Sequence, residues 1–205
     1  LINLGTPDNQ SPSAIRRYLR EFLLDPRVID LPAWLRYPLV YGAILPFRPY
    51  RTAKAYQKIW QANGSPLRIH TEALQTAVSE KLGPNHKVVS AMRYGKPNIQ
   101  AALQQLSTCT EIIVLPLFPQ YSSAATGSAI AKVMTEYARA WNIAKLTIID
   151  NFYDDAGFIN AYANHIEPYV DDETFILFSY HGLPERHLTK SQCHSICAHS
   201  DSCPK

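Results

Sequence analysis

Apolar and polar residues follow a helical period through the first part of the chain. Residues 11–23 open with Ser11 and Pro12, a common start of a helix, and carry one apolar face from Ile15 to Leu23. Residues 33–45 and 50–60 have the same kind of pattern. Ser65 follows the turn signal Asn63-Gly64 and is the expected N-cap of a long amphipathic helix. This part of the chain is therefore predicted to be mainly helical, after a short strand at residues 2–4.

From residue 87 onward, short apolar runs alternate with amphipathic stretches. We expect strands at residues 87–92, 111–118, 146–150 and 174–179, and helices at residues 99–106, 128–141 and 157–169. Strands that are apolar on both faces and separated by helices are typical of a parallel sheet covered on both sides. The sequence thus predicts an α/β fold with parallel sheets flanked by helices, whose functional residues gather at the carboxyl ends of the strands.

The sharpest chemical feature is His181, which directly follows the expected strand TFILFS. Gly182, Leu183 and Pro184 come next and cannot continue a strand, so we expect the imidazole at the edge of the sheet, open to a cleft. There it can accept a proton near neutral pH or bind a transition metal. The alternative is a core histidine that is hydrogen-bonded to the backbone.

Two further polar groups follow expected strands. Arg93 can hold a carboxylate with paired hydrogen bonds, and Tyr94 can offer a flat face and a hydroxyl. The alternative is a surface salt bridge and a packed aromatic ring. Residues 120–123 (QYSS) form either another polar cluster of a site or the N-cap of the next helix. No glycine-rich phosphate fingerprint follows any expected strand, which argues against a nucleotide-binding Rossmann enzyme.

Composition narrows the class of protein. The chain has 205 residues, of which 46% are hydrophobic and 18% charged, with a net charge of +3 and no basic stripe, so we expect a globular protein that does not bind nucleic acid. No apolar run is long enough to span a bilayer. Residues 31–47 predict either a surface helix that lies on a membrane or flanks a cleft, or an ordinary buried helix. We see no signal peptide and expect a cytoplasmic location, with peripheral contact to the inner membrane.

Five segments in order resemble those of the ferrochelatase family: LINLGTPD, YQKIWQANGSPL, AMRYGKP, VLPLFPQYSSAATGS and FSYHGLPERH. The resemblance implies a lyase of haem biosynthesis that inserts Fe²⁺, its metal substrate, into protoporphyrin IX to form protohaem. It also implies a chelatase-type, Rossmann-like fold of two similar lobes that grip the porphyrin. We expect residues 1–141 to form the first lobe and residues 142–205 to begin the second, with a cysteine-rich loop at 187–205. The chain would then be an N-terminal fragment with an incomplete second lobe.

The resemblance also implies roles for individual residues. His181 is the implied catalytic residue, which accepts pyrrole protons and contacts the incoming Fe²⁺, and its acidic partner would lie beyond residue 205. Arg51 and Lys54 would face the propionates, and an apolar residue at the position of Leu4 favours protoporphyrin over coproporphyrin. The implied substrate-binding positions are Leu4, Ser65, Arg93, Tyr94, Tyr121 and Ser122.

Three cysteines near the end of the chain, Cys193, Cys197 and Cys203, are spaced C-x₃-C-x₅-C with histidines between them. Thiolates this close together suit a zinc ion or an iron–sulfur cluster, each of which takes four ligands. The segment resembles an insert of cluster-bearing bacterial ferrochelatases, which implies a 2Fe–2S centre with its fourth ligand beyond residue 205. Zinc and a metal-free loop are the alternatives. Cys109 is expected to be a structural thiol.

Two other functions fit the same residues. A related chelatase would load cobalt or nickel into a different tetrapyrrole, and an inactive lobe would only carry a porphyrin. The segments PQYS and SYHGLP together favour ferrochelatase over the first of these. The sequence gives no indication of the oligomeric state.

Overall fold

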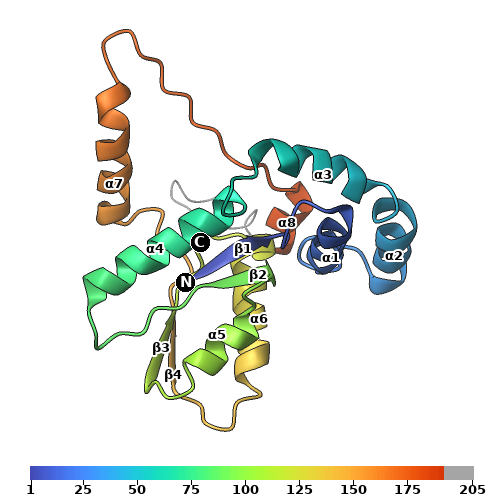
Figure 1. Ribbon diagram of the computed structural model, residues 1–205, viewed down its shortest axis with the longest axis horizontal. Helices are drawn as coiled ribbons and strands as arrows, with labels where there is room; N and C mark the ends of the chain where they lie inside the picture. The colour runs from blue at the N-terminus through green and yellow to red at the C-terminus, as the bar shows by residue number, and fades with distance from the viewer. Residues whose placement is uncertain (192–205) are drawn as a thin grey trace.

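The computed structural model describes residues 1–191, and its centre is a small parallel sheet (Figure 1). Strand β1 (Ile2–Thr6) pairs in parallel with β2 (Ala91–Gly95), and β3 (Glu111–Val114) pairs in parallel with β4 (Lys145–Ile148). The two pairs are joined at Ile2, whose N–H donates to the Leu115 carbonyl at 2.9 Å and whose carbonyl accepts from the Leu117 N–H at 2.7 Å. Strand β1 therefore lies between β2 and the residues that directly follow β3, and the parallel pairings confirm the predicted α/β fold.

Helices fill the connections between these strands. Between β1 and β2 lie α1 (Pro12–Leu23), α2 (Ala33–Pro38), the π-helix η1 (Leu39–Ile44), α3 (Arg48–Ile59) and α4 (Pro66–Leu82). Helix α5 (Ile99–Gln105) precedes β3, and the π-helix η2 (Ser123–Gly127) and α6 (Ser128–Tyr137) precede β4. After β4 come α7 (Ala156–Ile166), the 3₁₀-helix η3 (Glu167–Tyr169) and α8 (Glu185–Lys190). The predicted caps are confirmed, because Ser11 accepts from the Ala14 N–H and Ser65 from the Arg68 N–H.

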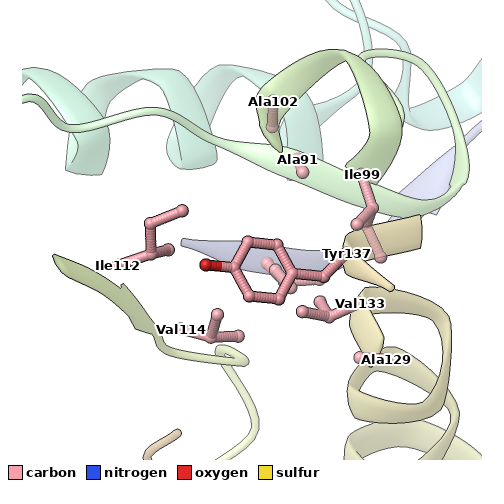
Figure 2. Close-up of a cluster of buried hydrophobic side chains, with 9 residues drawn as sticks. Ala91, Ile99, Ala102, Ile112, Val114, Ala129, Val133 and Tyr137 are labelled. Carbon is pink, nitrogen blue, oxygen red and sulfur yellow. The ribbon is translucent and has the colours of Figure 1, made fainter. Parts of the chain in front are cut away.

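Two apolar clusters hold the sheet to its helices. In the first, Ile112 and Val114 of β3 pack with Val133 and Tyr137 of α6 (Figure 2). The second gathers α1, η1 and α3 around Tyr94 near the carboxyl end of β2. Because Tyr94 belongs to this cluster, the end of β2 is positioned by packing against α1 as well as by pairing with β1.

One predicted strand is absent from the described residues. Residues 174–179 pair with none of the four strands, and Phe175 and Leu177 are 86% and 80% exposed. A strand needs a neighbouring backbone to satisfy its N–H and C=O groups, and no described strand lies beside this one. Among the described residues, the prediction of a strand at 174–179 is therefore wrong. Figure 1 shows α7 and the chain after it arching away from the sheet.

The other strand predictions are confirmed with shifted ends. The strand expected at residues 87–92 is β2, which starts at Ala91, and the one expected at 111–118 is β3, which ends at Val114. Strand β4 lies after residue 141, where the sequence placed the end of the first lobe, yet it pairs with β3.

The stretch from α2 to the start of α3 has a broad apolar surface. Val40 and Leu45 are buried, whereas Trp34 is 73% and Phe47 70% exposed. Of the two readings of residues 31–47, the structure supports the surface helix with an apolar face. Across residues 1–191 no helix combines the length and the apolar character that spanning a bilayer requires.

Candidate functional site

The carboxyl ends of β1 and β2 approach each other more closely than side chains would allow. Gly5 has φ +117° and lies opposite Tyr94, and a Cβ atom at Gly5 would stand 1.8 Å from the Tyr94 carbonyl oxygen. Gly95 has φ +91°, and its Cβ would stand 2.9 Å from the Thr6 carbonyl oxygen. Positive φ and missing side-chain volume are both properties of glycine. These two glycines therefore allow β1 and β2 to approach closely at the end of β2, where Arg93 and Tyr94 lie.

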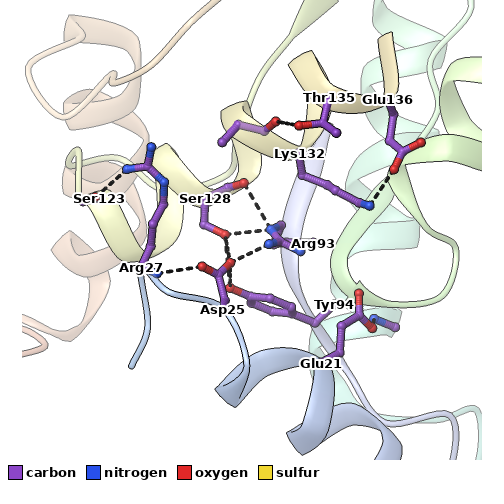
Figure 3. A network of polar contacts seen from close by, with 12 residues as sticks. Glu21, Asp25, Arg27, Arg93, Tyr94, Ser123, Ser128, Lys132, Thr135 and Glu136 are labelled. Carbon is purple, nitrogen blue, oxygen red and sulfur yellow. Dashed lines mark hydrogen bonds and ion pairs between the residues drawn. The ribbon is translucent and has the colours of Figure 1, made fainter. Parts of the chain in front are cut away.

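Asp25, just after α1, is the centre of a polar network at this edge (Figure 3). Its Oδ2 accepts from Arg93 Nη2 at 2.5 Å, from Ser128 Oγ at 2.5 Å and from Tyr94 Oη at 2.9 Å. Its Oδ1 accepts from the backbone N–H of Arg27 at 2.8 Å. One carboxylate thereby ties the loop after α1 to β2 and to the start of α6.

The charges in this network are balanced. Burial by itself would raise the pKa of the Asp25 carboxyl, but hydrogen bonds from Ser128, the Arg27 N–H and Tyr94, together with the charge of Arg93, lower the pKa below its ordinary value. Burial raises the pKa of the Tyr94 phenol. Asp25 is therefore ionised and Tyr94 is a protonated donor across the neutral range.

Arg93 is held on several sides. Its Nε donates to the carbonyl oxygen of Ser128 at 3.1 Å and to the Ser128 hydroxyl at 2.7 Å, and its guanidinium carbon lies 4.3 Å from the centre of the Tyr94 ring. Tyr94 is 0% exposed and presents neither its face nor its hydroxyl at the surface of the described chain. For Tyr94 this is the packed aromatic that the sequence left open as an alternative.

The QYSS segment starts a helix and also meets the loop after α1. Ser122 Oγ accepts from the Ala125 N–H at 3.2 Å and so caps η2. Arg27 Nη1 donates to Ser123 Oγ at 2.7 Å. Tyr121 is 37% exposed, so its side chain lies partly at the surface. The segment is thus a cap that stands beside the Asp25 network.

The remaining positions implied by the resemblance have mixed surroundings. Leu4 is partly buried against the second apolar cluster, and Ser65 is 2% exposed at the start of α4. Arg51 and Lys54 are exposed on α3. Leu4 shares its apolar cluster with Tyr94, while Ser65 is occupied as a helix cap.

His181 does not sit at the end of a strand, because residues 174–179 form none, and its side chain is exposed. The expected position at the sheet edge is therefore wrong for the described residues. Its ring Nδ1 lies 2.7 Å from the carbonyl oxygen of Gly182. A carbonyl oxygen only accepts, so Nδ1 carries the proton and Nε2 of the neutral ring keeps its lone pair. Within residues 1–191, His181 makes no contact with Arg93 or Tyr94.

Helix α8, which follows His181, is attached to the loop after α1. Lys190 Nζ lies 2.6 Å from Asp30 Oδ1, and Arg186 Nε lies 3.7 Å from Asp30 Oδ2. A hollow of about 260 Å³ beside this contact is lined by Pro26, Arg27, Asp30, Ser123, His187 and Lys190, together with Ser191. The loop thus meets the Arg93 network at one end and the chain after His181 at the other.

Sequence reasoning missed Asp25 and Asp30. The dipeptide Asp25-Pro26 is a turn signal and so marks the end of α1. It does not reveal that the same carboxylate reaches Arg93 across 68 residues or Ser128 across 103.

Cys193, Cys197 and Cys203 lie outside the described residues. Within residues 1–191 no group of three or more His, Cys, Asp or Glu side chains is arranged to hold a metal ion. Cys109 is a free thiol, partly buried against the first apolar cluster, in keeping with a structural role.

The fold and this site define an α/β protein with a parallel sheet and a buried, charge-balanced cluster at the strand ends. A sequence model described as Ferrochelatase matches residues 1–202. A ferrochelatase of Legionella pneumophila (strain Paris) is 51% identical over 197 residues, which cover 96% of this chain and 60% of the relative. One of Coxiella burnetii (strain Dugway 5J108-111) is 49% identical over 209 residues, covering 99% of this chain and 58% of the relative.

The chain belongs to the ferrochelatase family. It spans about 60% of the length of the curated relatives that it matches.

Proposed function

We propose that the full-length protein is a ferrochelatase, a lyase of haem biosynthesis that inserts Fe²⁺ into protoporphyrin IX to form protohaem. The observation that carries this proposal is the match to the family over residues 1–202, with about half of all positions identical to named ferrochelatases. The partly buried, apolar Leu4 supports protoporphyrin as the porphyrin substrate.

The test is an anaerobic absorbance assay of the full-length protein with Fe²⁺ and protoporphyrin IX. Formation of protohaem at a rate far above the protein-free reaction is the expected result. A product with cobalt or nickel in another tetrapyrrole, and none with iron, would assign a related chelatase instead. Porphyrin binding without any insertion would assign a carrier lobe.

In the proposed reaction two pyrrole N–H protons leave the porphyrin as the metal enters. His181 is the proposed acceptor of these protons and a contact of the incoming Fe²⁺. Its hydrogen bond through Nδ1 leaves Nε2 as a base, and its exposed ring has room for a ligand. The charge balance is complete, because one Fe²⁺ replaces two protons.

Arg93 and Tyr94 have a binding rather than a chemical role in this proposal. Arg93 contacts the porphyrin. The buried Tyr94 supports Arg93, through its hydrogen bond to Asp25 and through its ring, which lies against the guanidinium. Leu4, Tyr121, Ser122 and Ser65 complete the proposed walls of the pocket. Of these, Tyr121 is the most accessible.

We also propose that Cys193, Cys197 and Cys203 hold a 2Fe–2S cluster, with zinc as the competing occupant. Three thiolates within eleven positions are a donor set that fits either group. A 2Fe–2S centre absorbs visible light, whereas d¹⁰ zinc does not. Reddish protein with equal iron and acid-labile sulfide supports the cluster, and colourless, active protein with one zinc would replace it by a zinc site.

The proposed location is the cytoplasm, with peripheral contact to the inner membrane. The support is the exposed apolar surface of α2, η1 and the start of α3, where Trp34, Tyr41, Phe47 and Tyr50 are all at least 49% exposed. Aromatic side chains of this kind settle at the level of lipid headgroups. Sedimentation with lipid vesicles should fall when Trp34 and Phe47 are replaced by Ser, and unchanged sedimentation would contradict the contact.

A further inference from the structure

We propose that Asp25 is a positioning residue of the porphyrin site, which fixes the guanidinium of Arg93 and cancels its charge. Arg93 then meets the porphyrin as a set of aimed N–H donors, and not as a free cation. This inference rests on the proposed function, and it names a residue to which neither the family segments nor the strand-end pattern points.

The distribution of hydrogen bonds on Arg93 is the first reason. The guanidinium has five N–H groups in a planar fork. Here Nε is used by Ser128 and Nη2 by Asp25, and within residues 1–191 no hydrogen bond engages Nη1. Two partners on adjacent edges fix the plane of the fork, and Nη1 is the edge that stays available for a ligand.

The charge of the pair is the second reason. Asp25 is 6% exposed and the side chain of Arg93 13%, so water screens the pair weakly. Separating two buried opposite charges is strongly destabilising. The ionised Asp25 carboxylate therefore holds the Arg93 guanidinium in place. A propionate that approaches Arg93 therefore meets an Arg93–Asp25 pair with no net charge, where direction and distance decide binding.

The convergence of donors on a single atom is the third reason. Oδ2 of Asp25 takes hydrogen bonds from Arg93, Tyr94 and Ser128, which come from β2 and α6, while Oδ1 takes the Arg27 N–H of its own loop. Figure 3 shows these side chains pointing toward the carboxylate from different elements. Among the described residues Arg93 has no other acidic partner. A shift of the Asp25 carboxylate would therefore also shift Arg93.

A double-mutant cycle in the full-length protein tests the inference. The variants are Asp25→Asn, Arg93→Leu and both together, and the control is Asp8→Asn, the same change in the exposed Asp8–Arg17 ion pair. Asp25→Asn should raise the KM for protoporphyrin by about tenfold, the scale of one lost charge-assisted hydrogen bond, with kcat within about twofold. In the Arg93→Leu background the same change should add less than about twofold, because its target is gone.

Additive effects of the two changes on KM would overturn the positioning role, since Asp25 would then act independently of Arg93. Asp8→Asn should leave KM and kcat unchanged. If Asp25→Asn folds poorly, the double variant should melt at a higher temperature than Asp25→Asn alone, because it removes both buried charges. A double variant no more stable than Asp25→Asn would also count against the pairing.

Quenching of intrinsic fluorescence by protoporphyrin supplies a readout that needs no turnover. The same cycle in the dissociation constant should show the same lack of additivity. If the wild-type protein binds porphyrin but forms no metalloporphyrin, the proposed function fails while the cycle in binding still decides the role of Asp25.

Discussion

Lys190 and Asp30 lie 160 residues apart in the chain, and their side chains meet at 2.6 Å between Nζ and Oδ1. With Arg186 this contact attaches α8 to the loop that begins at Asp25. Since His181 precedes α8 by only a few residues, the loop after α1 joins the two parts of the proposed site.

Asp30→Asn should loosen α8 without unfolding the protein. Lys190 is 67% exposed and Arg186 54%, so the ion pairs are partly screened and contribute only about 1 kcal/mol or less. We expect amide hydrogen exchange in residues 185–190 to accelerate by about two- to fivefold. Lys190→Met should have a similar effect that does not add to that of Asp30→Asn, and unchanged exchange in both would show that α8 is held by other contacts.

His181→Ala should lower the turnover of the full-length enzyme by at least ~100-fold, the scale of a lost general base. Its matched control is His86→Ala, because His86 is also exposed and also contacts a carbonyl oxygen through Nδ1, at 3.0 Å from Leu82. Steady-state assays with Fe²⁺ should show normal turnover for the control. Normal turnover in His181→Ala as well would remove His181 from the mechanism.

Gly5→Ala should destabilise the protein strongly. The added Cβ would overlap the Tyr94 carbonyl oxygen at 1.8 Å, and the residue would keep a φ of +117°, so we expect a loss of about 3 kcal/mol or more. Gly42→Ala is the control, since nothing lies within 4 Å of its Cβ position. Urea unfolding of both variants measures the difference, and equal midpoints would contradict the close approach of β1 and β2.

The contribution of Asp25 to stability should depend on pH in one direction. Its pKa is lower in the folded than in the unfolded state, so its stabilisation is fully present above the unfolded value of about 4. It is lost as the pH falls through the lower folded pKa. The difference in unfolding free energy between wild type and Asp25→Asn should therefore be constant near pH 7 and shrink at pH 3. A difference that grows toward acid would mean that the carboxylate is not stabilised in the fold.

The sequence by itself determined the local structure. Serine caps before proline, the helical faces of α1 and α4 and the apolar runs of β3 and β4 depend on neighbours a few positions away, and each formed as expected. The ordered family segments also predicted the family. These features are local because a cap or an amphipathic face is complete within one element.

Only the tertiary structure decided which side chains meet. Apolar periodicity reports that a face is buried, but not against what, so it predicted a strand at residues 174–179 that has no described neighbour to pair with. Likewise, nothing near Asp25 in the chain shows that its carboxylate balances Arg93. The dipeptide Asp25-Pro26 predicts only a turn. The packing of α1 and α6 around β2 determines that Arg93 is the partner of this carboxylate.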